Sequence, residues 1–230
     1  MRQVSIQQIM SGDSMSVLNF VNESKVLGAN DAVTIASALK TFTTQVCTAW
    51  NIPNMPVIQS NTRSASGWNV CVVDQFPKPI QAYGYHEILN GQPIAYIRAG
   101  AFATAPLGKF RKGISFKGKV ISKDRYQEGT ASVVFHEVIE MLIDPNINKV
   151  SGPDSQGRRW LMEPADHVRG ALYRIPVGGT DVIAPDWTLP AYYDLSAKGP
   201  YSYLNSVSTP FTLTPTGYGY YKDALGLHKI

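Results

Sequence analysis

The sequence predicts an α+β fold: a twisted mixed β-sheet packed on a backing helix and an active-site helix, followed by a loop-rich C-terminal extension. Three observations support this prediction. Helical periodicity covers residues 30–50, and about four short β-like runs follow it. A second, strongly apolar helix covers residues 132–145. Beyond it the chain is rich in proline, glycine and tyrosine and has little helical periodicity. Runs of both periodicities in one chain are typical of mixed folds.

Three parts follow from this pattern. Residues 1–29 are expected to form an N-terminal arm with some strand character at 16–21. Residues 30–175 are expected to form a metal-binding domain. Residues 176–230 are expected to be a Pro/Tyr-rich C-terminal extension packed on the same domain. A chain of 230 residues is long enough to bury one full core.

The first helix and the strands have clear local patterns. Apolar residues recur on one helix face, at Val33, Ala36, Leu39, Val46 and Trp50, before NIPNMP ends the helix. The turn sequences FPKP and LNGQP separate the β-like runs. We expect strands at residues 56–59, 69–74, 80–86 and 94–98.

The second helix, SVVFHEVIEMLIDP, carries an unusual charge load. Apolar side chains cover most of its circumference, which indicates a buried helix. At about 100° per residue, His136, Glu137, Glu140 and Asp144 fall on one narrow stripe. No lysine or arginine lies among them. Crowded carboxylates disfavour ionisation, and a bound cation would relieve that cost.

A metal site explains the stripe. His136 and Glu140 are spaced i, i+4 and can reach one ion. Glu137 lies beside them, where a general base would meet a metal-activated water. The simpler alternative is a helix with one hydrated face and no metal.

A third ligand is expected from the later segment EPAD. Glu163 and Asp166 are three residues apart, and one helical turn would place them on one face. Either could complete the site. His86, His167 and His228 are weaker candidates, and His167 beside Asp166 could orient that ligand. One histidine with two carboxylates suits zinc less than usual and admits Mn²⁺, Fe²⁺ or Ca²⁺ instead.

The bulk properties restrict partners and location. The net charge is +4, and residues 108–125 carry seven basic residues against Asp124 alone. This stretch could bind nucleic acid or an acidic neighbour, but it has no nucleic-acid motif, and a solvated hairpin is the simpler interpretation. Cys47 and Cys71 are expected to be buried free thiols. The N-terminus has no secretory signal, and no apolar run could span a membrane, so we expect the host cytoplasm or a virion.

Several motifs together point to a family. They are CTAW at 47–50, GYHE at 84–87, HEVIEMLIDP at 136–145, EPAD at 163–166, PAYYD at 190–194 and GYGYY at 217–221. In this order they resemble a group of proteins encoded by bacteriophages and prophages. The central helix is similar to that of zincin metallopeptidases, whose motif is His-Glu-x-x-His. The resemblance implies a zincin-like fold and a role associated with phages. Glu140 departs from the second histidine of the zincin motif, and this departure puts peptidase activity in question.

The function expected from these features is a metal-dependent, metallopeptidase-like hydrolase of phage origin acting on a peptide or protein. Glu137 would be its general base, and zinc its ion. His86, His167, Tyr192 and Tyr193 are candidates to orient the ligands or to stabilise an oxyanion. The alternative is a non-enzymatic virion protein that contacts other virion proteins and has a structural metal or none. A metal-free binding module is a third alternative. The sequence leaves open whether the protein is an enzyme.

Overall fold

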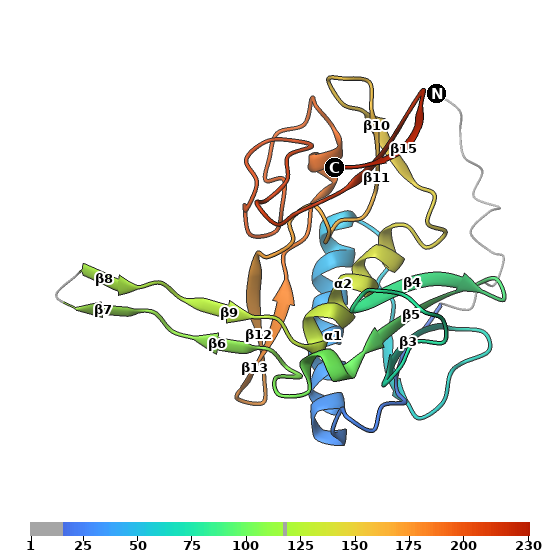
Figure 1. The fold of residues 1–230 in the computed structure, drawn as a ribbon, viewed down its shortest axis with the longest axis vertical. Coiled ribbons are helices and arrows are strands. Elements are labelled where there is room, and N and C mark those ends of the chain that lie inside the picture. The colour runs from blue at the N-terminus through green and yellow to red at the C-terminus, as the bar shows by residue number, and fades with distance from the viewer. Residues whose placement is uncertain (1–15, 117–118) are drawn as a thin grey trace.

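The computed structural model describes residues 16–116 and 119–230. A five-stranded sheet lies at its centre, with the strand order β2-β1-β3-β5-β4 (Figure 1). Four strands are parallel, and the edge strand β4 is antiparallel to β5. The expected strands are present, although β4 begins four residues later than predicted. The bounds are β1 (Leu18–Asn22), β2 (Val57–Ser60), β3 (Trp68–Val73), β4 (Gly84–Leu89) and β5 (Gln92–Arg98).

The expected N-terminal arm lies partly outside the described residues, which begin at residue 16. Its later part contains β1, which pairs in parallel with both β2 and β3. Residues 18–22 of the arm are therefore part of the central sheet.

Two α-helices cover one face of this sheet. They are α1 (Ala29–Trp50) and α2 (Thr130–Ile143), at the predicted positions. Side chains alternate between the two faces of a strand. On the face toward the helices, Phe20 of β1, Val72 of β3 and Ile97 of β5 are fully buried in the main core. Phe42 of α1 stacks on Phe135 of α2 with ring centroids 4.9 Å apart, which joins the two helices. Val33, expected on the buried face of α1, is 51% exposed.

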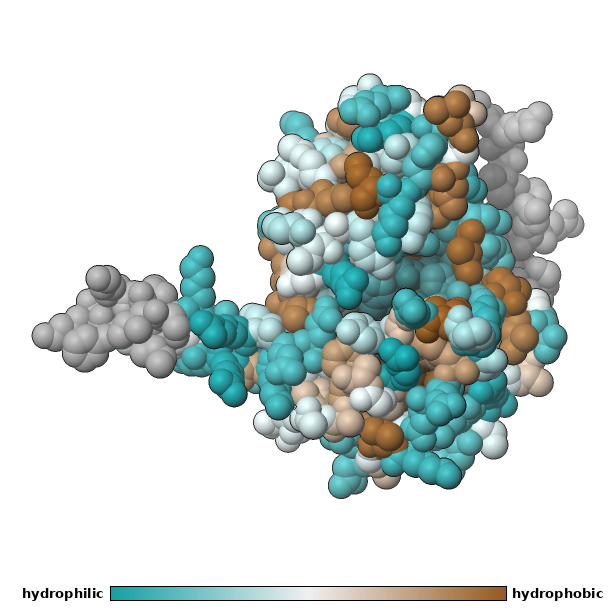
Figure 2. All heavy atoms as spheres, in the orientation of Figure 1, coloured by the Kyte–Doolittle hydropathy of each residue, from teal (hydrophilic) through white to brown (hydrophobic). Residues whose placement is uncertain are grey.

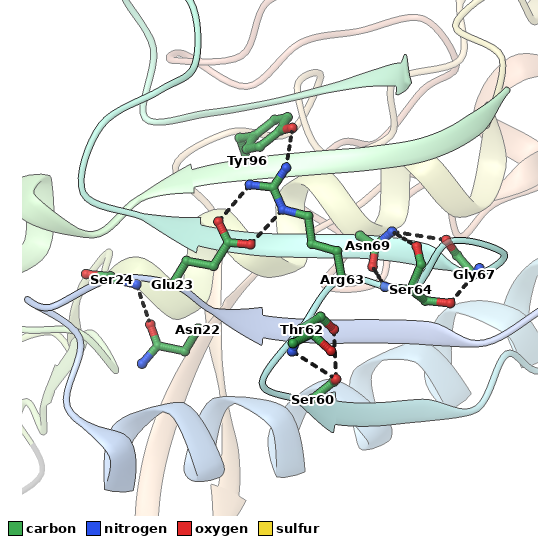
Figure 3. Close-up of polar contacts among 10 residues, drawn as sticks. All are labelled: Asn22, Glu23, Ser24, Ser60, Thr62, Arg63, Ser64, Gly67, Asn69 and Tyr96. Carbon is green, nitrogen blue, oxygen red and sulfur yellow. Dashed lines mark hydrogen bonds and ion pairs between the residues drawn. The ribbon is translucent and has the colours of Figure 1, made fainter. Parts of the chain in front are cut away.

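The opposite face of the sheet has a smaller core around Val21, Cys71 and Tyr96. Arg63 closes it at the surface (Figure 3). Its guanidinium donates to both carboxylate oxygens of Glu23, at 2.6 and 2.7 Å, and to the Tyr96 hydroxyl at 3.0 Å. Cys71, like Cys47, is a buried free thiol, as predicted.

The other elements are mainly short antiparallel strands. One four-stranded sheet has the order β10-β11-β14-β15, and three two-stranded hairpins pair β12 with β13, β6 with β9, and β7 with β8. Two short 3₁₀ helices complete the description. The bounds are η2 (Ala99–Phe102), β6 (Lys109–Arg111), β7 (Ile114–Phe116), β8 (Lys119–Ser122), β9 (Arg125–Gln127), β10 (Val150–Pro153), β11 (Arg159–Leu161), β12 (Leu172–Val177), β13 (Thr180–Pro185), η3 (Pro190–Tyr193), β14 (Tyr220–Asp223) and β15 (Gly226–Lys229).

The predicted α+β, zincin-like class is wrong for this chain. The described residues contain two α-helices, of 22 and 14 residues, against fifteen strands in five separate sheets. The structure is mostly β. The boundary expected between residues 175 and 176 falls inside β12, which pairs with β13 along its whole length. No helix among the described residues is long and apolar enough to cross a membrane.

The extra strands form because tight turns connect β-forming residues. Gly178 and Gly179 join β12 to β13, and both have positive φ values, 55° and 84°. Two consecutive positive φ values match the two-residue turn that fits the twist of a hairpin. Asn90 and Gly91 do the same between β4 and β5, with φ values of 52° and 78°. No hairpin is predicted at Gly178–Gly179, so the expected β content is lower than the observed one.

The stacked phenylalanines between α1 and α2 generate a stability prediction. Phe135→Ala should lower the free energy of unfolding by about 3–5 kcal/mol, because it leaves a cavity in a fully buried site. Val33→Ala, on the exposed face of α1, should change it by less than about 0.5 kcal/mol. Urea unfolding followed by circular dichroism measures both values. Equal effects would contradict the assigned core.

Candidate metal centre

The helix α2 is buried almost completely, because it lies between the central sheet and the β12–β13 hairpin. Thirteen of its fourteen residues are buried, and the exception is His136. Gly129 is the N-cap residue of the helix. A side chain at Gly129 would lie 2.4 Å from the carbonyl oxygen of Ala105. The Ser132 hydroxyl accepts from the Gly129 amide at 3.2 Å and donates to the Ile183 carbonyl at 3.0 Å, which fixes the start of the helix.

Asp144 does not belong to the site, although the sequence places it on the same stripe. It follows the last turn of α2, and its carboxylate accepts from the amides of Asn148 at 3.0 Å and Lys149 at 2.7 Å. The Asp144 carboxylate is therefore occupied by the loop after the helix.

The first ligand group consists of His136, Glu140 and Asp166. His136 Nε2 lies 3.2 Å from Glu140 Oε1 and 3.1 Å from Asp166 Oδ1. Ligands about 2.0–2.1 Å from a tetrahedral ion are about 3.3 Å from one another. The observed separations fit that geometry, so this group could hold a divalent metal ion.

The hydrogen bonding around this group supports a cation. Glu140 Oε1 and Asp166 Oδ1 are inaccessible to solvent and have no hydrogen-bond partner of acceptable geometry among the described residues. They lie within ion-pair distance of His136, but their angles do not satisfy a hydrogen bond. Buried carboxylate oxygens without a partner are costly. A metal ion among the three atoms would remove that cost.

Burial and mutual charge shift the pKa values of the three residues in this group. Burial raises the pKa of Glu140 to about 7, against the opposing charge of His136. Burial also opposes protonation of His136, but the charges of Glu140 and Asp166 outweigh it and raise its pKa well above the ordinary value. Burial opposes ionisation of Asp166, but the nearby His136 outweighs it and lowers the pKa of that carboxyl. Without metal, His136 is the cation that holds the two acids.

Glu163 lies near the group but is not part of it. Burial, together with the charges of Glu140 and Asp166, raises the pKa of Glu163 to about 9. Its carboxylate oxygens do not lie close enough to the other ligand atoms to belong to either ligand group of the described residues. Of the two candidates for third ligand, the structure places Asp166 beside His136 and Glu140.

A second group lies next to the first and shares Glu140. It consists of His86, Glu137 and Glu140. His86 Nδ1 lies 3.2 Å from Glu137 Oε2 and 3.6 Å from Glu140 Oε2. Burial opposes protonation of His86, but the bond to Glu137 and the charge of Glu140 raise its pKa above the ordinary value. One oxygen of Glu140 thus faces His136 and the other faces His86.

His86 reaches α2 because β4 packs directly on the helix. A side chain at Gly84 would lie 2.6 Å from Val133 Cγ1 and 2.7 Å from Glu137 Oε1. Glycine at this position permits the close approach. The motif GYHE therefore combines the residue that allows contact with the histidine that makes it.

His228, another sequence candidate, lies on β15 with its Nε2 2.9 Å from Asp223 Oδ1 and belongs to neither ligand group. The remaining candidates, His167, Tyr192 and Tyr193, lie in an aromatic cluster. His167 Nδ1 is 3.1 Å from the Tyr193 hydroxyl, and its ring stacks on Tyr192 with centroids 5.1 Å apart. The Tyr192 hydroxyl donates to the Thr212 carbonyl. None of His167, Tyr192 and Tyr193 lines the cleft described next. The structure does not bring these three side chains to a position where they could meet a substrate.

A cleft of about 640 Å³ opens over His136 and Glu137. The start of β4 forms one wall, and Arg169, Tyr218 and Tyr220 form another. Tyr218 was not identified from the sequence as a site residue. Its amide donates to the Asp166 carbonyl at 3.1 Å. Partial burial, followed by the charge of the nearby Asp166 carboxylate, raises the pKa of the Tyr218 hydroxyl. The motif GYGYY was noted, but nothing in the local sequence connects it to Asp166.

Comparison with known proteins adds no assignment. No protein-family model, no curated protein and no solved structure matches this chain. The resemblance to bacteriophage and prophage proteins therefore stays a prediction.

The buried His167 generates a prediction about acid stability. Burial lowers the pKa of His167 to about 4, whereas an unfolded chain has a histidine pKa of about 6.5. The unfolded state therefore binds its proton first as the pH falls. Stability is fully present above pH 6.5, falls between pH 6.5 and 4, and loses roughly 3 kcal/mol from this group.

The measurement is urea unfolding at several pH values for the wild type and for His167→Gln. The variant should lack the part of the pH dependence that His167 causes. Identical slopes between pH 6.5 and 4 would contradict a buried neutral His167.

Proposed function

We propose that this protein is a metal-dependent hydrolase that cleaves peptide bonds. One observation carries the proposal. Two buried carboxylate oxygens, on Glu140 and Asp166, have no hydrogen-bond partner among the described residues and converge with His136, which lines a cleft. Glu137 lines the same cleft. It is not in the first ligand group, so its carboxylate is not needed to hold the ion and can act on a substrate. This arrangement combines an ion site with a free carboxylate.

We propose zinc as the ion, held by His136, Glu140 and Asp166. Three protein ligands leave one position open, as catalytic sites require. The two carboxylates also suit Mn²⁺, Fe²⁺ or Ca²⁺, so metal content is measured before zinc is assumed. When bound, the ion supplies a Lewis acid that polarises a carbonyl and acidifies water.

The residues of the chain carry the proton transfers. Glu137 accepts the proton of the attacking water and passes it to the leaving amine. The hydrogen bond from His86 at 3.2 Å orients the Glu137 carboxylate. The Tyr218 hydroxyl, beside Asp166 and at the cleft wall, is placed to donate to a developing oxyanion.

The free edge of β4 favours an extended peptide as the substrate. The Arg98 amide donates to the Tyr83 carbonyl at 2.9 Å, so Tyr83 belongs to a hydrogen-bonded pair with β5. Bonded and non-bonded pairs alternate in antiparallel strands. The backbone N–H and C=O groups of Gly84 and His86 therefore point away from β5. A peptide could pair with them as an added strand beside the cleft.

The ligand assignment predicts the metal content of four variants. Purified wild-type protein should bind about one equivalent of zinc. Glu140→Gln and Asp166→Asn should lose most of it, because each removes a charged ligand. Glu137→Gln and Glu163→Gln should retain it, because neither residue is in the first ligand group. Mass spectrometry of the metals and calorimetric titration measure this.

Loss of metal from Glu163→Gln but not from Asp166→Asn would reverse the assignment of the third ligand. A wild type that takes up no divalent ion would remove the hydrolase proposal. A bound ion without any peptide cleavage would favour the structural alternative, a virion protein in which the ion links α2 to the segment containing Asp166.

The proton-transfer roles predict different effects for Glu137 and His86. Glu137→Gln should lower kcat on a fluorogenic peptide library by about 10²–10⁴-fold with unchanged metal content, because the general base is lost. His86→Gln should lower kcat less and should alter the pH profile. If protonated His86 positions Glu137, the activity of the wild type declines as the pH rises through the raised pKa of His86. This decline at alkaline pH should be absent in His86→Gln.

A pH profile that His86→Gln leaves unchanged would contradict the positioning role of His86. Full activity of Glu137→Gln would contradict its role as base.

A further inference from the structure

A two-stranded arm extends from the body of the molecule (Figure 1). Its base is the β6–β9 ribbon, and β7–β8 continues it outward. We call β6, β9 and the described residues between them the basic arm. Figure 2 shows mainly hydrophilic residues where the arm leaves the body. The proposed hydrolase site does not use this element.

The arm holds the positive charge of the chain. Residues 108–125 contain seven of the 21 lysines and arginines but one of the 17 acidic residues. The rest of the chain therefore has 14 basic and 16 acidic residues and is slightly negative. An element with this charge contrast is typical of a surface that binds a polyanion.

Three cations share one face of the ribbon. Arg111 lies directly opposite Arg125, and Lys109 is two residues from Arg111 on the same strand. Side chains alternate along a strand, so all three project from one face. All three are exposed. Like charges directly opposite each other destabilise a ribbon, and no acidic side chain pairs with any of these three in the described part of the chain.

The reverse face attaches the arm to the body. Phe110 packs on Tyr126 with ring centroids 5.2 Å apart. The Arg174 guanidinium of β12 lies 4.4 Å from the centre of the Phe110 ring. The aromatic face thus accounts for how the ribbon is held on the body.

We propose that the basic arm binds duplex DNA by placing the β6–β9 ribbon in the major groove. The major groove is about 12 Å wide and admits a two-stranded β-ribbon. Lys109 and Arg111 are about 7 Å apart along the strand, which corresponds to two phosphates of one DNA strand. Arg111 and Arg125 would then each meet a phosphate, and their mutual repulsion would be neutralised. The arm would then recognise the phosphates and the width of the groove and would not distinguish base sequences.

The test uses the full chain and a fluorescent duplex of mixed sequence, about 20 base pairs long, followed by anisotropy between 50 and 200 mM salt. Non-specific binding should have a Kd of about 10⁻⁴–10⁻⁶ M. The triple variant Lys109→Gln/Arg111→Gln/Arg125→Gln should weaken binding at least about tenfold and reduce the salt slope by about 2.7. The control triple Lys25→Gln/Lys40→Gln/Lys198→Gln removes equal charge from exposed positions elsewhere and should retain the wild-type slope.

A second variant separates binding from folding. Arg125→Glu replaces a like-charge pair by an opposite-charge pair across the ribbon. Its melting temperature should be unchanged or higher by up to about 3 °C, while DNA affinity falls at least about tenfold. A fall in both melting temperature and DNA affinity would show that the substitution had disrupted the arm. The affinity of the triple glutamine variant would then decide whether the arm binds DNA.

Four results would overturn the proposal. The first is the absence of DNA binding at 50 mM salt. The second is equal loss of affinity in the arm variant and the control triple. The third is displacement by polyglutamate as effective as by duplex DNA, which would assign the arm to an acidic protein. The fourth is equal affinity for a single strand of the same length, which would exclude insertion in the major groove.

Discussion

The burial of α2 is the constraint on which the rest of the structure depends. A helix that is apolar on nearly all sides and carries His136, Glu137 and Glu140 cannot balance those charges by itself. The compensation has to come from elements far away in the sequence. β4 supplies His86, and the segment after β11 supplies Asp166. The strands around α2 are therefore positioned by charge as well as by apolar packing.

Glu140 and Asp166 each have one buried carboxylate oxygen without a hydrogen-bond partner in the part of the chain that the structure describes. Glu140 has one oxygen facing His136 and one facing His86, so a single carboxylate connects the two groups. The apolar surroundings make each unpaired oxygen more costly than it would be in water. A divalent cation bound by His136, Glu140 and Asp166 would give both of these oxygens a partner. It would leave the hydrogen bond between His86 and Glu137 in place. This separation of tasks is why we distinguish ion-holding residues from proton-transferring ones.

The arm and the candidate metal centre differ in their charged side chains. The carboxylates of Glu137, Glu140 and Asp166 gather around His86 and His136, whereas exposed basic side chains cover one face of the β6–β9 ribbon. Arg174 connects the arm to β12, and β13, the partner of β12, packs on α2. The arm and the helix that carries the candidate metal centre are thus connected through the β12–β13 hairpin.

The sequence by itself determined the local features, because they depend on spacing within one element. The i, i+4 pair of His136 and Glu140, the apolar burial of α2, the turn at Asn90–Gly91 and the free cysteines all follow from neighbours along the chain. The zincin-like class was wrong because hairpins such as β12–β13 have weak local patterns. Only the tertiary structure decided between Asp166 and Glu163, brought His86 and Tyr218 to the site, and removed His167 from it. Those outcomes depend on which distant segments pack together, because burial and the charges of neighbouring side chains together shift the pKa values at the site.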